Sequence, residues 1–419
     1  MSQEEQTIKL DQRDVLDAAM TAGHILLENG AEIFRVEETI DRICHHFGVQ
    51  SENAFVLSNG IFLTSGDEHE KRFARVEHIP VRGAQLHRVA AVNQLSREIE
   101  EGKYTLPEIR EKLEQIRNAP GASKRALVLM SGLGSGCFCL MFGGMWQDCV
   151  AAFVIGCLLY LYLLWLNGRC SKIVENIGGG IIITVCSLLF IHMPFEMDMS
   201  HMISGSIMPL VPGLAFTNGI RDIADGDYIS GTVRMIDAVL VFLSVAAGVG
   251  CVLSIYHLSS SDGRCHAVTD LLQILAAGIG TVAFGALFGV PSKYYPYCGL
   301  IGASGWAVYV FLWMRTGFWS EAVVVFLATV LVILMSRFFA VRERCPVTIF
   351  LICGILPLVP GAGIYWTCYY LVTGQLDEAS TRGFSALKAA VAIVLGIVFV
   401  FEIPQRFFKG KAVRKNDKL

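Results

Sequence analysis

The residues best suited to bind a small polar molecule follow a five-residue motif that occurs twice. Pro-Leu-Val-Pro-Gly begins at Pro209 and again at Pro357, 148 positions later. A helix that restarts after such a motif offers its first amide groups to a carboxylate. The residues that follow differ, since hydrogen-bonding and charged side chains come after the first copy and aromatic ones after the second: Thr217, Asn218, Arg221 and Asp222, against Tyr365, Trp366 and Thr367.

These residue types predict complementary roles in binding. Thr217 and Asn218 can hydrogen-bond an amino or hydroxyl group. The faces of Tyr365 and Trp366 can hold an ammonium group or act as a gate. We therefore predict a substrate site around the two motifs, formed by Pro209, Pro212, Gly213, Thr217, Asn218, Pro357, Pro360, Gly361, Tyr365 and Trp366.

Three aspartates are candidates for proton coupling. Asp222 follows the first motif closely, and Asp237 and Asp270 lie within or at the edge of apolar spans. An ionisable residue inside a bilayer is costly unless it is paired or hydrated, so it is a functional candidate by default. A position at the membrane surface fits Asp237 and Asp270 equally well. A solvated mouth of the span explains Asp222 and Asn218 equally well, and we favour it for Asp225 and Asp227.

Other groups of reactive residues receive structural interpretations. The sequence Cys44-His45-His46 with Asp41 lacks further ligands at close range and predicts a helix surface. The charges of Glu32, Arg35, Glu37 and Glu38 predict a solvated or docking face. The thirteen cysteines lie mostly as single residues in apolar runs, which favours reduced thiols. No nucleophile lies near a base, so we expect no enzymatic activity, no cofactor and no metal site.

The elements that position these residues cross a membrane. With 53% hydrophobic residues, 17% charged residues and a mean hydropathy of +0.52, the chain of 419 residues predicts an integral membrane protein. About 20 apolar residues cross a bilayer as a helix. On that length we expect ten spans, at 126–145, 149–166, 177–193, 201–220, 235–256, 270–289, 297–314, 319–335, 346–366 and 385–404. Each Pro-Leu-Val-Pro-Gly copy breaks one span, which is tolerated only where protein or a water-filled cavity satisfies the freed backbone groups.

Residues 1–125 contain no span of membrane length. Apolar residues at helical spacing predict helices around 15–26, 33–47, 86–100 and 106–116. Two strand-like runs, 53–64 and 72–81, are separated by a turn at 65–67. We expect a small cytosolic α+β domain. The polar residues 1–14 contain no apolar signal region.

Loop charges predict the orientation, because Lys and Arg gather on the cytoplasmic side. If residues 1–125 are inside, so are most basic loops, with Arg169, Lys172, Arg221, Arg234, Lys293, Arg337, Arg342, Arg344 and the tail 405–419. The outside loops contain only Arg264, Arg315 and Arg382. We expect a multi-pass protein of the cell membrane with both termini in the cytoplasm. The net charge of −3 and the lack of a basic arm give no sign of nucleic-acid binding.

The repeat predicts two halves of opposite orientation. Each half, 126–256 and 267–404, has five spans. Because five is an odd number, the second half starts on the other side of the membrane and must be inverted. A second match supports this, because Gly132, Gly134, Phe138, Phe142 and Gly143 recur 146 positions later as Gly278, Gly280, Phe284, Phe288 and Gly289. The glycine-rich stretch 132–136 lies in an apolar span without a flanking strand, so it predicts close helix packing and not a nucleotide-binding loop.

These motifs resemble those of the threonine/serine exporter family over nearly the whole chain. Residues 26–32 with Arg35-Val36-Glu37 are similar to the opening motif of the family, 209–231 to the motif of its first membrane half, and 356–363 to that of its second. Some members are split into two proteins, and this chain resembles the fused form. The resemblance implies export of small hydroxy amino acids driven by the proton gradient.

Alternatives to a threonine/serine–proton antiporter stay open. Split relatives handle other small carboxylates, so export of dicarboxylates such as succinate is one alternative. A channel, or a membrane scaffold with a regulatory cytosolic domain, is another. A membrane-embedded hydrolase would need a clustered nucleophile and base. The expected partners are a small-molecule substrate, protons and the lipid bilayer, and a homo-oligomer stays open.

Overall fold

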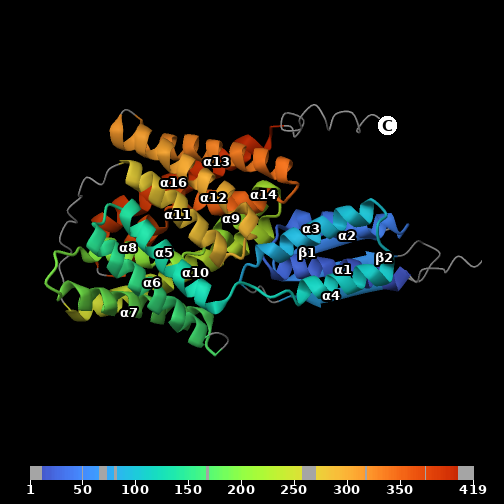
Figure 1. Cartoon of the computed structure of the whole chain (residues 1–419), viewed down its shortest axis with the longest axis horizontal. Coiled ribbons are helices and arrows are strands. Elements are labelled where there is room, and N and C mark those ends of the chain that lie inside the picture. Colours follow the sequence, from blue (N-terminus) through green and yellow to red (C-terminus); the bar gives the residue numbers. More distant parts are fainter. Residues whose placement is uncertain are drawn as a thin grey trace, which may run out of the picture. The chain divides into compact units, whose positions relative to one another are not determined.

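The computed structural model describes residues 12–49, 51–65, 73–79, 83–166, 169–256, 270–316, 319–372 and 374–403 (Figure 1). The predicted basic tail, 405–419, and Arg264 lie outside these residues. Contacts between residues divide the chain into two units. Unit 1 comprises residues 1–121 and 222–233, and unit 2 comprises residues 122–221 and 234–419.

Unit 1 combines helices with a small antiparallel sheet. Its strands run in the order β1-β2-β3, and its helices precede and follow them: α1 (Gln12–Glu28), α2 (Ile33–His46), β1 (Ser51–Leu57), β2 (Gly60–Ser65), β3 (Phe73–His78), α3 (Leu86–Glu100) and α4 (Leu106–Arg117). The predicted strand 53–64 is wrong, because Leu57 pairs with Gly60 and Ser58-Asn59 turns the chain between β1 and β2. Part of the predicted turn at 65–67 lies outside the described residues.

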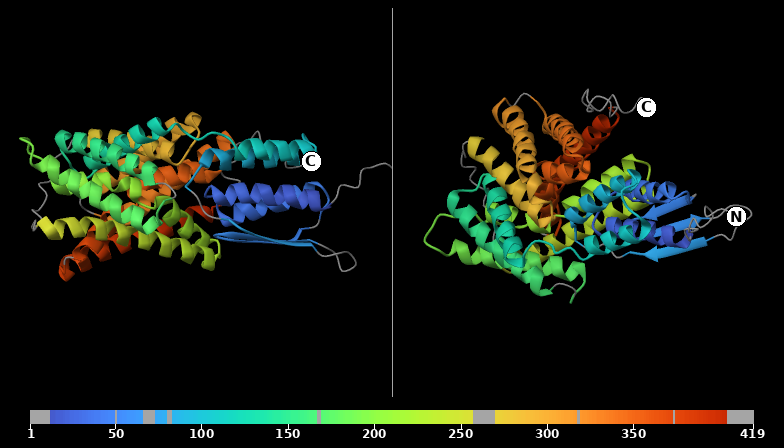
Figure 2. Two further views of the ribbon diagram at one scale, coloured as in Figure 1. Left: turned by 90° about the horizontal axis from the view of Figure 1, so that it is seen from below. Right: turned by 45° about the vertical axis from the view of Figure 1, so that its right-hand side comes forward.

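Alternation along the strands determines which face of the sheet is buried. Val56, Ile61 and Leu63 face the core, whereas Phe55 and Phe62 are exposed. Helices α1 and α2 cover the buried face, as Figure 2 shows. Gly23 in α1 permits this approach, since an added Cβ would lie 2.8 Å from the side chain of Ile40 and 3.0 Å from that of Ile61.

Two charged residues of α2 and its N-terminal end depart from the predicted solvated face. Glu32 is fully buried, and its Oε2 lies 3.5 Å from Nε of Arg35, so the prediction is wrong for this residue. Glu37 accepts a hydrogen bond of 3.1 Å from the backbone N–H of Val56. Burial raises the pKa of Glu37, and the nearby carboxylates of Asp227 and Asp41 raise it further against the lowering effect of that hydrogen bond. Thus the 222–233 segment brings a carboxylate close to α2.

The Cys44-His45-His46 sequence is only partly a helix surface. His45 and His46 are exposed, as predicted. Cys44 faces the core, because it lies one turn after Ile40 on the buried stripe of α2. Burial raises the pKa of the Cys44 thiol to about 12, so the thiol stays protonated at neutral pH.

Unit 2 is helical, and its helices run side by side in Figure 1. They are α5 (Lys124–Met141), α6 (Trp146–Leu166), α7 (Lys172–Ile191), α8 (Met199–Ser206), η1 (Met208–Leu210), α9 (Gly213–Ala224), α10 (Tyr228–Tyr256), α11 (Asp270–Leu287), η2 (Ser292–Tyr294), α12 (Tyr295–Tyr309), η3 (Val310–Arg315), α13 (Glu321–Glu343), α14 (Val347–Ile355), η4 (Leu356–Leu358), α15 (Gly361–Val372) and α16 (Leu376–Phe401). Unit 1 includes the end of α9 and the start of α10.

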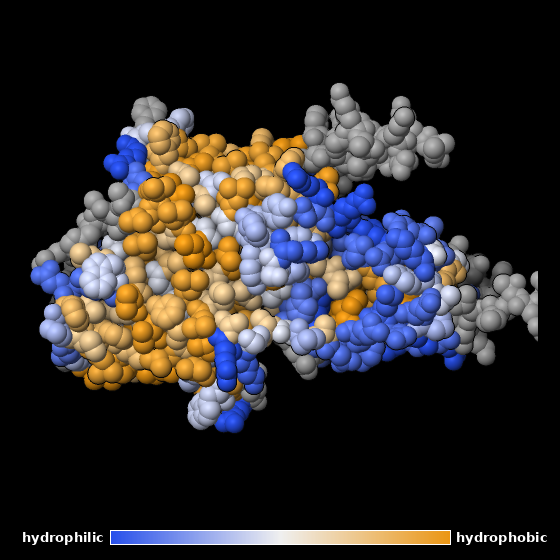
Figure 3. All heavy atoms as spheres, in the orientation of Figure 1, coloured by the Kyte–Doolittle hydropathy of each residue, from blue (hydrophilic) through white to orange (hydrophobic). Residues whose placement is uncertain are grey.

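The membrane spans agree with the sequence prediction. Eight described helices are long and apolar enough to cross a bilayer, and two bent helix pairs bring the number to as many as ten. Each predicted span overlaps one of them. Hydrophobic side chains form the visible outer surface of these helices in Figure 3. The chain is therefore mainly helical, with eight to ten candidate membrane helices.

Small residues let the membrane helices approach closely, as the glycine-rich stretch predicts. Gly134 in α5 faces the ring of Phe284 in α11, where an added Cβ would lie 2.7 Å from the ring. Gly280 in α11 faces Phe138 in the same way, at 3.4 Å. The two rings meet edge to face with centroids 5.2 Å apart. Since these residues are equivalent in the 146-residue repeat, the contact between the two halves is reciprocal.

Candidate functional site

The two Pro-Leu-Val-Pro-Gly copies form the same backbone break. The first bends α8–η1 against α9 by 60°, and the second bends α14–η4 against α15 by 49°. Val211 and Val359, which precede the second proline of each copy, have nearly identical extended conformations, with φ/ψ of −63/123° and −62/126°. A following proline disfavours the helical region, so the motif itself explains why both helices stop here. In each copy the glycine begins the next helix.

The two breaks lie against each other. An added Cβ on Gly213 would lie 2.8 Å from Cδ1 of Leu356 in the second copy. An added Cβ on Gly361 would lie 3.1 Å from Cγ2 of Val211 in the first copy. The structure therefore brings together the two motifs that the sequence places 148 residues apart, and the glycines let the two breaks pack this closely.

The helices before the two breaks differ in polarity. Helix α8 is buried and contains the polar residues His201, Ser204 and Ser206. At the equivalent places, 148 positions later, α14 has Ile349, Ile352 and Gly354. Sequence reasoning missed the polar side of α8, although the cluster of Ser and His just before Pro209 was a usable signal.

The helices after the breaks differ as the sequence predicts. In α9, Thr217 donates a 2.8 Å hydrogen bond to the carbonyl of Gly213, and both Thr217 and Asn218 are almost fully buried. The buried guanidinium of Arg221 lies over the ring of Phe401 in α16, 4.2 Å from its centroid. Asp222 is buried as well. In α15 the equivalent positions are aromatic.

The aromatic face of α15 reaches the polar helix α8. Nε1 of Trp366 donates a 3.2 Å hydrogen bond to Oγ of Ser204. Tyr365 is 1% exposed and packs in one cluster with Met202, Ile207 and Leu210. Its hydroxyl is buried without a hydrogen-bond partner among the described residues. Buried hydroxyls of this kind are costly, and the hydroxyl of Ser206 is in the same state.

Two of the predicted proton-coupling residues have cationic partners. Oδ2 of Asp237 lies 2.5 Å from Nζ of Lys172, and Oδ2 of Asp270 lies 2.5 Å from Nε of Arg315. Both carboxylates are partly exposed. Neither residue lies at the crossing of the breaks: Asp270 is the first residue of α11, and Asp237 lines a separate cavity.

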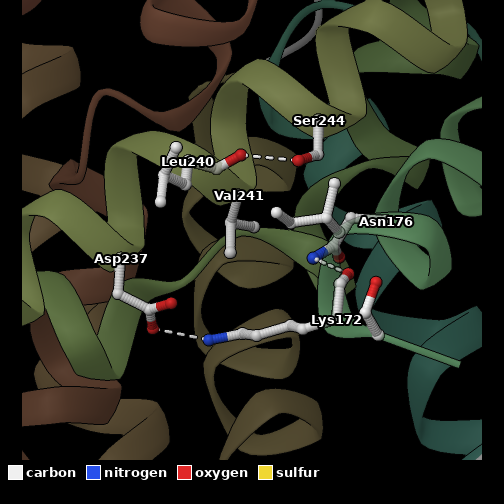
Figure 4. A pocket seen from close by; sticks show the side chains of 8 residues that line it. Lys172, Asn176, Asp237, Leu240, Val241 and Ser244 are labelled. Atoms are coloured by element: carbon white, nitrogen blue, oxygen red, sulfur yellow. Dashed lines mark hydrogen bonds and ion pairs between the residues drawn. The ribbon is translucent and has the colours of Figure 1, made fainter.

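That cavity, of about 260 Å³, lies between α7 and α10 (Figure 4). The Lys172–Asp237 ion pair lies on one side of it in Figure 4, and Asn176 and Ser244 add amide and hydroxyl groups. The apolar part of its lining comes from Ile173, Leu240 and Val241. Sequence reasoning missed this cavity, because Lys172 and Asp237 are far apart in the chain.

A further buried carboxylate was also missed. Asp148, near the start of α6, accepts backbone hydrogen bonds of 2.8 Å from Met145 and 2.9 Å from Asp198. It thereby fixes the turn between α5 and α6 to the segment that leads into α8. Nδ1 of His201 lies 3.7 Å from Oδ2 of Asp198 in the same region.

Two family models cover almost the whole of this architecture. The model ThrE, a threonine/serine exporter, matches residues 17–256, and the model ThrE_2, described as Threonine/Serine exporter, ThrE, matches residues 273–403. The chain belongs to the threonine/serine exporter family. Together with its apolar helices, membership of this family makes it a multi-pass membrane protein and a transporter.

Individual relatives carry different names. The threonine/serine exporter of Corynebacterium glutamicum is 23% identical over 400 residues, which cover 92% of this chain and 81% of the relative. A probable succinate transporter subunit, YjjP, of Klebsiella aerogenes is 27% identical over 256 residues, which cover 60% of this chain and 98% of that protein. Pheromone-regulated membrane protein 10 of Pichia sorbitophila is 23% identical over 67% of this chain and 29% of its own length. No solved structure matches the chain significantly.

Proposed function

We propose that this transporter exports small hydroxy amino acids, threonine and serine, by alternating access around the two crossed breaks. The observation that carries the proposal is the contact of Gly213 with Leu356 and of Gly361 with Val211. Paired helix breaks at corresponding places of two halves are where secondary transporters bind substrate. The inverted orientation of the halves is part of this proposal, and the reciprocal contact of Phe138 with Phe284 supports it.

The substrate would lie at the crossing. Its carboxylate would meet the first amides of α9 and α15, near Gly213 and Gly361, because the N-terminus of a helix attracts negative charge. Thr217, Asn218 and the buried hydroxyl of Tyr365 would hydrogen-bond its amino and hydroxyl groups. Trp366 would stay in place through its hydrogen bond to Ser204. Pro209, Pro212, Pro357 and Pro360 would keep the backbone open at this point.

Unit 1 and both termini would lie in the cytoplasm. The basic residues of the loops support this orientation. The assignment of residues 222–233 to unit 1 supports it too, because the α9–α10 connection lies on the predicted cytoplasmic side.

Proton coupling would involve Asp222, Asp237 and Asp270. Asp222 is buried, and the other two each have a cationic partner that a proton could displace. Neutralising the three residues together should abolish transport driven by a pH gradient. Transport that persists in the triple variant would contradict the coupling proposal.

A second candidate substrate is a small dicarboxylate such as succinate, which the name of the Klebsiella relative favours. The two substrates differ in charge, since succinate carries no ammonium group for an aromatic face to hold. Reconstituted protein should therefore exchange labelled threonine and serine, and not succinate, in a counterflow assay. Movement of succinate alone would select the second candidate, and non-saturable flux would indicate a channel.

A further inference from the structure

The cavity between α7 and α10 lies next to a place where these two helices cross closely. Gly248 lies so near α7 that an added Cβ would be 2.1 Å from the carbonyl oxygen of Ile177. Gly180 makes the reciprocal contact, because an added Cβ there would lie 2.5 Å from the carbonyl oxygen of Val245. The residues that line the cavity precede these glycines in both helices, so the cavity lies on the N-terminal side of the crossing.

Its two charges come from different helices. Lys172 is the first residue of α7, and Asp237 lies in α10 (Figure 4). Their charged atoms are 2.5 Å apart, and the side chains are 58% and 45% exposed. An exposed ion pair of this kind contributes only about 0–1 kcal/mol. A ligand that replaces both halves of the pair can therefore enter at little cost.

Hydrogen-bonding groups lie farther along the cavity. The hydroxyl of Ser244 donates to the carbonyl of Leu240 at 2.7 Å, so its lone pairs stay able to accept. Nδ2 of Asn176 donates to the carbonyl of Lys172 at 2.8 Å, which leaves the amide oxygen as an acceptor. Both residues are largely buried. Together they can accept a hydrogen bond from a hydroxyl group on a ligand.

We infer that this cavity binds a small zwitterion, with its carboxylate at Lys172 and its ammonium at Asp237. One cation and one anion suit one carboxylate and one ammonium on the same carbon atom. A dicarboxylate would place its second negative charge next to Asp237, where like charges repel. Phosphatidylethanolamine has the same pair of charges in its headgroup. We favour a free hydroxy amino acid because of Ser244 and Asn176.

The cavity borders the buried hydrophobic cluster that also contains residues of the two broken spans. Val241, which lines it, belongs to the same buried cluster as Leu210 and Tyr365. Gly179 in α7 faces Leu210, with 2.9 Å between an added Cβ and Cδ1. The role of the cavity rests on the proposed function: it would be a loading site, at which the substrate binds before it reaches the crossing.

Site-resolved acetylation of lysine residues tests the inference on the full chain in phosphatidylcholine nanodiscs. Threonine should slow the labelling of Lys172 at least fivefold at saturation. Lys124 is the matched control, because it is also an exposed first residue of a membrane helix after a serine. Its labelling should not change. N-acetylthreonine lacks the ammonium and threonine methyl ester lacks the carboxylate, so neither should protect Lys172.

Two variants locate the contacts. For each variant, the labelling rate of Lys172 is compared with and without threonine. In Asp237→Asn, threonine should no longer slow this labelling. Ser244→Ala should weaken protection by threonine about tenfold, the equivalent of ~1.4 kcal/mol, and leave protection by 2-aminobutyrate unchanged. Equal weakening for both ligands would overturn the assignment of the hydroxyl.

The remaining outcomes separate this inference from the proposed function. Protection by succinate or N-acetylthreonine equal to that by threonine would overturn the zwitterion assignment. Protection by phosphatidylethanolamine in the nanodisc, with no effect of threonine, would overturn the amino-acid assignment. Lys172 that is protected in a protein unable to transport threonine or serine would contradict the proposed function alone. Transport of threonine with Lys172 unprotected would contradict the cavity alone.

Discussion

The two broken spans share a backbone and differ in almost every side chain near it. Val211 and Val359 agree within a few degrees in both dihedral angles. When the motifs are aligned, polar residues after the first copy correspond in sequence to aromatic residues after the second: Thr217 to Tyr365, Asn218 to Trp366, Arg221 to Tyr369 and Asp222 to Tyr370. The fold therefore contains the same break and the same helix start twice, but the side chains next to the two breaks differ.

This difference suggests a division of labour. Each break begins one helix, and in the proposed function the two helix N-termini together would bind the carboxylate of any substrate. In the proposed function, the first span would add the hydrogen-bonding groups that distinguish one amino acid from another. The second span adds large rings that fill space, and its hydrogen bond from Trp366 to Ser204 connects the two spans. Four predictions test this division.

The largest effect should follow the removal of the ring of Tyr365. Tyr365→Ala should lower the free energy of unfolding by about 3–5 kcal/mol, as for other large buried aromatic residues. Tyr365→Phe removes only a hydroxyl without a described partner, so the free energy of unfolding should be unchanged or higher. Denaturation in lipid–detergent micelles measures both. If Tyr365→Phe is as stable as the wild type and transports threonine normally, the hydroxyl has no role in binding.

The next effect concerns selectivity. Asn218→Ala should lower transport of threonine about 100-fold, the equivalent of ~2.7 kcal/mol. In this variant a polar group of the bound substrate would be buried without a hydrogen-bond partner. Trp366→Phe keeps an aromatic face and should lower transport only about tenfold. Initial rates in vesicles, with protein amounts matched, give the ratio. Equal losses in the two variants would remove the proposed division between the spans.

A smaller effect should distinguish the two glycines at the crossing. Gly361→Ala brings a methyl group against both γ-carbons of Val211, at 3.1 and 3.2 Å, and this β-branched side chain cannot turn away. Gly213→Ala meets the flexible end of Leu356. We expect Gly361→Ala to destabilise the protein by about 1–3 kcal/mol and Gly213→Ala by less. Thermal unfolding in matched micelles measures the order, and the reverse order would show that the breaks pack differently.

The sequence predicted what is local and missed what depends on distant partners. The eight to ten candidate spans and both breaks follow from hydropathy and from proline, so their prediction needed no knowledge of neighbours. Glu32 looked solvated because its burial depends on the core around α1 and α2. Asp237 looked like a lone carboxylate because Lys172 lies on another helix. The polar residues of α8 gave a signal before Pro209, but only the contact of Ser204 with Trp366 shows that they face the second half.

The smallest effect should come from the hydrogen bond that joins the two spans. In a double-mutant cycle, Ser204→Ala and Trp366→Phe should show a coupling energy of about 0.5–1.5 kcal/mol, the usual net value of one hydrogen bond. Trp306 in α12 is the matched control, because its buried Nε1 has no hydrogen-bond partner among the described residues. Ser204→Ala and Trp306→Phe should therefore be additive within about 0.3–0.5 kcal/mol. Coupling in the control pair as large as in the test pair would mean that Ser204 acts through general packing. Coupling in the test pair alone would show that the hydrogen bond from Trp366 to Ser204 fixes the second broken span against the first.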